Sequence, residues 1–243
     1  MNIYLVRHGL SEANVDKSLH GKIADHAIKL ATEGILQAQK AGEFLNKHFK
    51  YQFPHNIEHI KCNKHIRMWV SPYQRTRQTA AEIFKNTEYS YKDGSKHNRI
   101  TSQREHINLV EQQFGLFNGL SDDKMYNEIQ QKYPDEYEHY KKCEDFGGKF
   151  WARMPLGESR FDVTLRVQQS FGTFWRDAEK HGIENIVVVA HGLSIRAFIM
   201  SWMHYSVEWF ESEPNPPNCS IRLLQNNVDK GYIFEGFDKH KLK

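Results

Sequence analysis

Eight residues near the N-terminus, Asn2 to Gly9 (NIYLVRHG), decide how the rest of the chain is interpreted. Asn2–Val6 is a short apolar run, and Arg7-His8-Gly9 ends it with a charged residue, a titratable residue and a glycine. An apolar run of this length, bounded by a turn signal, is typical of a strand that is buried on both faces. The chain is therefore predicted to begin with a central strand of a sheet.

The same pattern returns near residue 190, where Ile186–Ala190 (IVVVA) runs into His191-Gly192. Elsewhere, apolar residues recur at helical spacing and predict helices. Alternating strands and helices indicate an α/β layered domain. The further predicted elements are a strand over Arg67–Val70, weaker edge strands over Ile221–Leu224 and Tyr232–Phe234, and helices from Ile35 to Phe49, from Val163 to Ala178 and from Ser194 to Met203.

Two stretches interrupt this alternation. Residues 86–108 are polar, and no main-sheet element is predicted there. Residues 121–159 are aromatic and charged, and we expect them to form a helical insertion over one end of the sheet. The length of the chain fits a single domain over residues 1–243 that includes this insertion.

Composition excludes several classes of protein. The 243 residues carry a net charge of +3 without a basic block, which argues against a nucleic-acid partner. No run approaches the roughly 18 apolar residues of a membrane span, and we expect no signal peptide. Three widely spaced cysteines without a CxxC pair predict free thiols and a cytoplasmic location. The 14 histidines form no clean metal-ligand spacing, so neither a metal nor another cofactor is expected.

Three predicted strands end in polar residues at one edge of the sheet. Ligands of open α/β sheets bind outside the carboxyl ends of the strands, which singles out Arg7-His8-Gly9, Ser71-Pro72 and His191-Gly192. Arg75 follows Ser71 by about one helical turn. A single His-Gly pair carries little weight, since a solvated histidine explains it equally well. Two guanidiniums and two imidazoles together, however, would form a site for a dianionic phosphoryl group.

These residues also carry a resemblance to a known family. Leu5 to Asn14 (LVRHGLSEAN) is similar to the opening motif of the histidine phosphatase superfamily, which includes the cofactor-dependent phosphoglycerate mutases. Asp25-His26 and Asn218-Cys219 extend the resemblance to a eukaryotic branch of that superfamily described as phosphatase-like. Five further segments resemble later motifs of the family, in the family's order. They are Leu30–Gly34 with Gln37-Ala38, Ser71–Ala80, Val110–Gly115 with Gly119, Gly157–Val163, and Ala190–Gly192.

The resemblance implies a phosphoglycerate mutase-like fold, a three-layer sandwich whose mostly parallel central sheet is flanked by helices. It also implies a phosphomonoester hydrolase whose active site the 121–159 insertion would cover. By resemblance, His8 is the nucleophile that forms a phosphohistidine, and Glu111 is the general acid and base. The residues expected to bind the phosphoryl oxygens are Arg7, Ser11, Asn14, Arg75, His191 and Gly192.

This mechanism sets a protonation problem. His8 must be neutral, with its Nδ1–H held by a backbone carbonyl, while Glu111 must be protonated. Unperturbed histidine titrates at about pH 6.5 and glutamic acid at about pH 4.3. A neutral His8 is therefore favoured near neutrality, but there Glu111 should be ionised. Repulsion from a bound phosphate would favour the protonated form of Glu111. We therefore expect activity to be highest on the acidic side of neutrality.

Two other functions stay open at this point, a 2,3-bisphosphoglycerate-dependent phosphoglycerate mutase and a non-catalytic binding protein on the same fold. The mutase pattern has a tyrosine three positions after the acidic residue and an Arg-Arg pair downstream. This chain has Phe114 at the first position and no Arg-Arg within residues 121–159, which favours hydrolysis over transfer. The complete set of reactive residues disfavours a non-catalytic protein. Small-molecule phosphoesters and phosphoproteins both stay open as substrates, as does the oligomeric state.

Overall fold

A computed structural model describes residues 1–52, 65–90, 94–118 and 122–238. In this part of the chain a six-stranded sheet has the order β5-β2-β6-β1-β7-β8. Neighbouring strands from β5 to β1 are parallel, and β7 is antiparallel to β1 and β8. The predicted, mostly parallel central sheet is thus confirmed. Its strands are β1 (Asn2–Arg7), β2 (His65–Val70), β5 (Ile100–Glu105), β6 (Ile183–Ala190), β7 (Ile221–Gln225) and β8 (Val228–Phe234).

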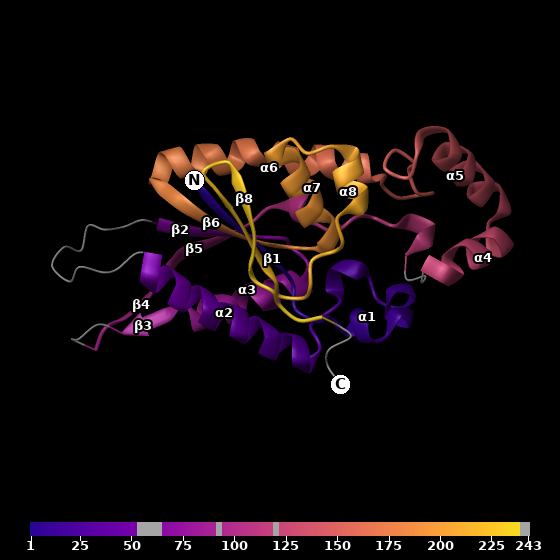
Figure 1. The fold of residues 1–243 in the computed structure, drawn as a ribbon. Helices are drawn as coiled ribbons and strands as arrows, with labels where there is room; N and C mark the ends of the chain where they lie inside the picture. The colour runs from indigo at the N-terminus through magenta and orange to yellow at the C-terminus, as the bar shows by residue number, and fades with distance from the viewer. Residues whose placement is uncertain (53–64, 91–93, 119–121, 239–243) are drawn as a thin grey trace.

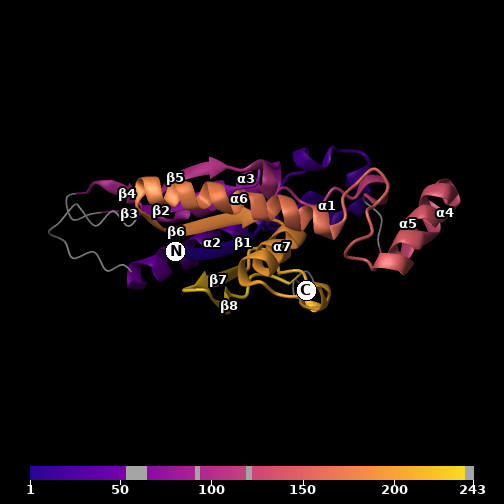
Figure 2. The same cartoon turned by 90° about the horizontal axis from the view of Figure 1, so that it is seen from above.

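Helices cover both faces of this sheet, as the two views in Figure 1 and Figure 2 show. Side chains alternate between the faces of a strand, so β1 contributes to two separate cores. Ile3 and Leu5 belong to the core shared with α6 and α7, whereas Tyr4 and Val6 belong to the core shared with α2 and α3. The three-layer sandwich is confirmed. The covering helices are α2 (Thr32–Gln52), α3 (Gln74–Asn86), α6 (Arg160–His181) and α7 (Gly192–Met203).

The sheet differs from the sequence prediction in two places. The polar stretch 86–108 contains β5, the edge strand beside β2. Ile100 is the only buried residue of β5, so this strand lacks the apolar pattern on which the other strands were recognised. The prediction that Ile221–Leu224 forms an edge strand is wrong, because β7 lies between β1 and β8 and its residues Ile221 to Leu224 are buried.

The segment 121–159 is helical only in its first part. α4 (Asp122–Lys132) and α5 (Pro134–Gly147) project beyond the carboxyl ends of the parallel strands (Figure 1). Their side chains Ile129 and Tyr140 pack on Phe117 of the short helix η4 (Gly115–Phe117). Residues 148–159 form turns and irregular structure. That the segment covers the active site stays a prediction.

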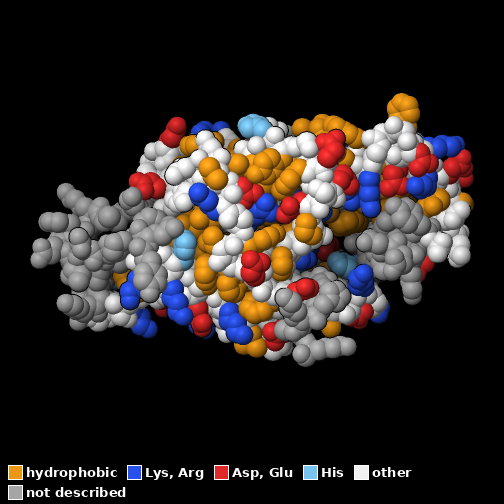
Figure 3. All heavy atoms as spheres, in the orientation of Figure 1, with side chains coloured by type: hydrophobic (Ala, Val, Ile, Leu, Met, Phe, Trp, Pro, Cys, Tyr) orange, Lys and Arg blue, Asp and Glu red, His pale blue; other side chains and the backbone are white. Residues whose placement is uncertain are grey.

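Short elements complete the chain, and the surface is mixed in charge. On the face shown in Figure 3, acidic and basic side chains are interspersed over the described surface. Cys143 and Cys219 are free thiols, and Cys62 lies outside the described residues. No helix within the described ranges has both the length and the apolar character needed to cross a membrane. The remaining elements are α1 (Glu12–Val15), η1 (Lys17–Gly21), η2 (Asp25–Ala27), β3 (Glu88–Ser90), β4 (Lys96–Asn98), η3 (Ile107–Leu109) and α8 (Val207–Ser212).

Candidate active site

His8 lies directly after β1, at the carboxyl edge of the sheet, and is 4% exposed. Two hydrogen bonds hold the His8 backbone. The His8 N–H donates to the Ala190 carbonyl (3.0 Å), and Asn218 Nδ2 donates to the His8 carbonyl (3.0 Å). The ring Nδ1 lies 2.7 Å from the carbonyl oxygen of Gly9. Because a carbonyl can only accept, Nδ1 carries the proton and Nε2 keeps a free lone pair. This is the tautomer that the mechanism expected from the sequence requires.

The loop after His8 crosses the start of α2 so closely that the two backbones are in contact. A Cβ atom on Gly9 would lie 2.4 Å from the Gly34 carbonyl oxygen, and one on Gly34 would lie 2.1 Å from the Leu10 oxygen, so neither position tolerates a side chain. The loop is also held by side chains, since the Gly9 N–H donates to Thr79 Oγ1 (3.1 Å) and the Leu10 N–H to Gln37 Oε1 (2.9 Å). These contacts fix the backbone that carries the histidine.

His191 is brought next to His8 because β6 pairs with β1 in parallel register. The side chain is fully buried, and the two imidazole centres are 5.2 Å apart. Nε2 of His191 lies 2.8 Å from Ser71 Oγ, at the end of β2. With the Ser71 hydroxyl as donor, Nδ1 of His191 carries the proton, and it has no hydrogen-bond partner within the described part of the chain. A buried donor left in this state favours a ligand oxygen as its acceptor.

Two arginines supply positive charge at the same edge. Arg7, the last residue of β1, donates from Nη1 to the Pro216 carbonyl (2.5 Å). Arg75 is 4% exposed and donates from both terminal nitrogens to the Asp25 carboxylate (3.1 and 3.2 Å). Its guanidinium carbon also lies 4.9 Å from the centre of the Tyr73 ring. The strand ends therefore bring together the four residues that the sequence places in a phosphoryl site.

Burial and the two arginines control the protonation of the histidines. Burial, followed by the charges of Arg75 and Arg7, holds the pKa of His8 well below its ordinary value. Burial, followed by the charge of Arg75, does the same to the pKa of His191. Because a lowered pKa preserves the neutral form to lower pH, both imidazoles stay uncharged through neutrality and into mild acid. The fixed positive charge of the site is therefore carried by the arginines.

Glu111 lies beside the N-terminus of α7, close to His191. Its Oε2 accepts from the Leu193 N–H (3.4 Å), and its Oε1 accepts from the Gln112 N–H (3.0 Å). Ser194 Oγ is 3.5 Å from Glu111 Oε1. Glu111 as a residue is only half-buried, so it is partly open to solvent or a ligand. This position fits a group that exchanges protons with a ligand at the sheet edge.

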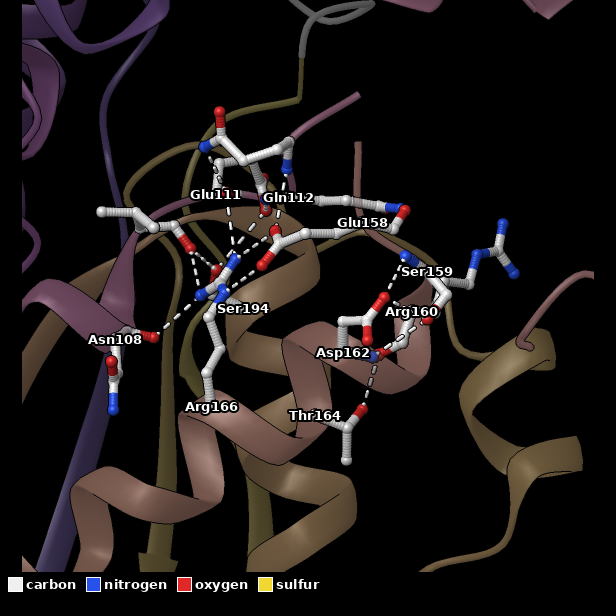
Figure 4. Close-up of polar contacts among 12 residues, drawn as sticks. Asn108, Glu111, Gln112, Glu158, Ser159, Arg160, Asp162, Thr164, Arg166 and Ser194 are labelled. Atoms are coloured by element: carbon white, nitrogen blue, oxygen red, sulfur yellow. Dashed lines mark hydrogen bonds and ion pairs between the residues drawn. The ribbon is translucent and has the colours of Figure 1, made fainter. Parts of the chain in front are cut away.

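An ion pair between Glu158 and Arg166 holds the backbone around Glu111 (Figure 4). Arg166 Nε and Nη2 donate to the two oxygens of Glu158 (2.8 and 2.9 Å). The same guanidinium donates to three backbone carbonyl oxygens, those of Asn108 (2.9 Å), Val110 (2.8 Å) and Glu111 (3.1 Å). Glu158 in turn accepts from the Gln113 N–H (2.9 Å) through its side chain. We call this arrangement the Arg166–Glu158 clamp.

Ser11, Asn14 and Gly192 have structural roles at helix starts. Ser11 and Asn14 form a capping box on α1, in which each side chain accepts from the other residue's backbone N–H. The Ser11 hydroxyl and the Asn14 amide group remain as donors that a phosphate oxygen could accept from. The assignment of Ser11 and Asn14 to phosphate binding stays a prediction. Gly192 is the first residue of α7, and its assignment also stays a prediction. Ser159 and Asp162 form a second capping box, at the start of α6.

Sequence reasoning did not identify Arg166, Asp25, Thr79 or Gln37 as residues that support the site. Their contacts join segments far apart in the chain, for example 70 residues between Gly9 and Thr79. One sequence signal was available for Arg166. It is a charged residue that directly precedes Val167, and Val167 lies on the apolar face predicted for this helix. No group of three or more His, Cys, Asp or Glu side chains that could hold a metal is present in the residues that the structure describes.

Comparisons with known proteins agree with the motifs. A family model described as the histidine phosphatase superfamily (branch 1) matches residues 3–235. Phosphoglycerate mutase-like protein AT74 of Arabidopsis thaliana is 34% identical over 92% of this chain, and the chain spans 64% of that relative's length. Broad-range acid phosphatase DET1 of Saccharomyces cerevisiae is 27% identical, with 92% of this chain and 84% of the relative covered. The solved structure of a mycobacterial glucosyl-3-phosphoglycerate phosphatase shares the fold, with a TM-score of 0.62, 20% identity and 98% of each chain covered.

Proposed function

Since the chain belongs to the histidine phosphatase superfamily, as its motifs predict, we propose that it hydrolyses phosphomonoesters through a phosphohistidine on His8. The observation that carries this proposal is the buried, neutral His8, whose Nδ1–H is held by Gly9 and whose Nε2 is free beside two arginines. A relative named as a broad-range acid phosphatase supports the same class of reaction.

In the first step, Nε2 of His8 attacks phosphorus, an N–P bond forms, and the P–O bond to the alcohol breaks. Glu111 gives its proton to the departing oxygen. In the second step Glu111 takes a proton from water, the water oxygen attacks phosphorus, and the N–P bond breaks to release inorganic phosphate. Arg7, Arg75 and the Nδ1–H of His191 stabilise the negative charge on the oxygens that do not react.

The runner-up function is a phosphoglycerate mutase, which must keep the phosphohistidine away from water. Two features favour the hydrolase. Phe114 stands where the mutase pattern has a tyrosine, and residues 121–159 contain no Arg-Arg. The half-buried Glu111 is also open to the water that the second step of hydrolysis consumes.

The test is a pair of assays on the purified chain, each with a chelator present. Hydrolysis of p-nitrophenyl phosphate is followed by absorbance, and conversion of 3-phosphoglycerate to 2-phosphoglycerate is followed in the presence of 2,3-bisphosphoglycerate. We expect turnover in the first assay and none in the second. Efficient mutase turnover with little hydrolysis would replace the proposal with the runner-up.

The Arg166–Glu158 clamp makes a separate prediction about the position of Glu111. Arg166→Met keeps most of the aliphatic stem but removes the donors to the carbonyls of Val110 and Glu111. We expect kcat to fall by about 100-fold with a small change in KM, because a shift of about 1 Å in a catalytic group costs that much. The control is Arg176→Met, on the exposed face of the same helix, where the side chain donates to Thr173 Oγ1 (3.2 Å). A lower melting temperature with kcat unchanged would reduce the clamp to a structural role.

A further inference from the structure

A pocket of about 150 Å³ opens beside Glu111, a volume equal to that of about five liquid water molecules. Its described walls include the three residues that follow the acidic group, Gln112, Gln113 and Phe114. The other described walls are Asp25, Gly115, Asn118 and Leu156. Asp25 is also the carboxylate that accepts hydrogen bonds from Arg75, so this residue joins the pocket to the phosphoryl site.

The position of the pocket identifies which part of a substrate it would hold. In the proposed function, Glu111 protonates the oxygen of the departing alcohol, so that oxygen must lie next to Glu111. The rest of the alcohol then extends toward the residues that follow Glu111 in the chain, and these residues are walls of the pocket. The pocket is therefore the site of the leaving group.

The two glutamines in the walls offer mainly acceptors to a ligand, because their amide nitrogens already donate to protein oxygens; the amide of Asn118 donates to the His20 carbonyl at 3.4 Å. Gln112 Nε2 donates to the Glu158 carbonyl (2.8 Å), and Gln113 Nε2 donates to Tyr73 Oη (2.6 Å). Gln112 itself is 2% exposed, and its Oε1 has no hydrogen-bond partner among the described residues. A buried acceptor of this kind is stabilised by a ligand that brings a hydroxyl or N–H donor.

The charge of the pocket also favours a neutral ligand that brings hydrogen-bond donors. Asp25 is the only charged side chain among its described walls. Burial alone would raise the pKa of Asp25, but hydrogen bonding from His20 and the charge of Arg75 outweigh it and hold the pKa below its ordinary value. The carboxylate is therefore ionised at neutral pH and paired with Arg75, so the described walls supply no free cation for a second anionic group on the substrate. Phe114 and Leu156 offer carbon surface instead.

We propose that this pocket selects phosphomonoesters of neutral, hydroxyl-bearing alcohols, of the polyol or sugar type, and rejects those whose alcohol carries a carboxylate or second phosphate; this inference rests on the proposed phosphatase function. Hydroxyl groups would donate to Gln112 Oε1 and to the Asp25 carboxylate. An anionic alcohol would place like charges together in a partly desolvated pocket, a recognised means of rejecting a ligand.

The test compares two substrates that differ in one group. Glycerol 3-phosphate and 3-phosphoglycerate have the same three-carbon skeleton, and a hydroxymethyl group in the first replaces the carboxylate of the second. We expect kcat/KM for phosphate release to be at least about 10-fold higher for glycerol 3-phosphate. A ratio near one, or a preference for 3-phosphoglycerate, would overturn the inference and leave the phosphatase intact. Hydrolysis of p-nitrophenyl phosphate without hydrolysis of either substrate would also overturn it, whereas inactivity on all three would remove the proposed function itself.

A charge added at the rim tests the location of the selectivity. Leu156 is 87% exposed, so Leu156→Lys adds a cation beside the pocket without disturbing the core. We expect this variant to lower the preference for glycerol 3-phosphate by about 3-fold or more, through a gain in kcat/KM for 3-phosphoglycerate. Val228→Lys is the matched control, on the edge strand β8, and it should leave the ratio unchanged. Equal ratios in the two variants would show that selectivity arises away from this pocket.

Discussion

Replacing His8 with alanine is expected to lower kcat/KM for p-nitrophenyl phosphate by about 10⁴-fold or more, because loss of a covalent nucleophile removes the reaction path itself. Among the described residues, the other imidazole at the site does not substitute for it. His191, the other imidazole at the site, has its Nε2 engaged by Ser71, and with that hydroxyl donating, its Nδ1 carries a proton and has no lone pair to offer. Initial rates over a range of substrate concentrations measure the loss.

A second measurement separates chemistry from folding. Rapid acid-free quenching after incubation with a ³²P-labelled phosphomonoester should trap label on the wild-type chain and none on His8→Ala. Phosphohistidine is lost in acid and retained in base, which distinguishes it from a phosphoserine. His181→Ala is the matched control, a histidine at the far end of α6 that faces Asp177 and is 38% exposed. Substantial activity in His8→Ala, with wild-type melting behaviour, would mean that another group is the nucleophile.

The histidines at strand ends could be predicted because their signal is local. β1 and β6 are buried on both faces, so each forms an uninterrupted apolar run, and the residue that ends the run is visible in the sequence. The parallel pairing of these strands then brings His8 and His191 together. β5 gave no such run, because only Ile100 is buried on this edge strand.

The supporting contacts of the site could not be predicted, because they are formed only by tertiary packing. Arg75 meets Asp25 across 50 residues of chain, and Arg166 meets the Val110 carbonyl across 56. No periodicity links such pairs, and a single charged residue on a helix is ordinarily a solvated one. The protonation state of His8 was required by the expected mechanism, but its cause, burial together with two arginines, is visible only in the fold.

Glu111→Gln is expected to lower kcat by about 10²–10⁴-fold for substrates with poor leaving groups, since general acid–base catalysis contributes that much. The amide is close in size and keeps an acceptor oxygen for the Leu193 N–H, so the fold should not change. p-Nitrophenol leaves readily without a proton, and its ester should therefore lose less in the first step. Comparing p-nitrophenyl phosphate with glycerol 3-phosphate in both proteins measures this difference, with Glu179→Gln, an exposed glutamate on α6, as control.

The pH profile gives the same assignment a second test. Because burial and two arginines lower the pKa of His8, Nε2 stays unprotonated in mild acid, and the nucleophile is not lost there. The first step also needs a proton for the leaving oxygen, and protons are less available as the pH rises. Activity on glycerol 3-phosphate should therefore peak below pH 7 and fall as the pH rises, and Glu111→Gln should flatten that fall because its amide has no proton to lose. A wild-type rate still rising at about pH 9 would exclude Glu111 as the acid, whatever the size of the loss on mutation.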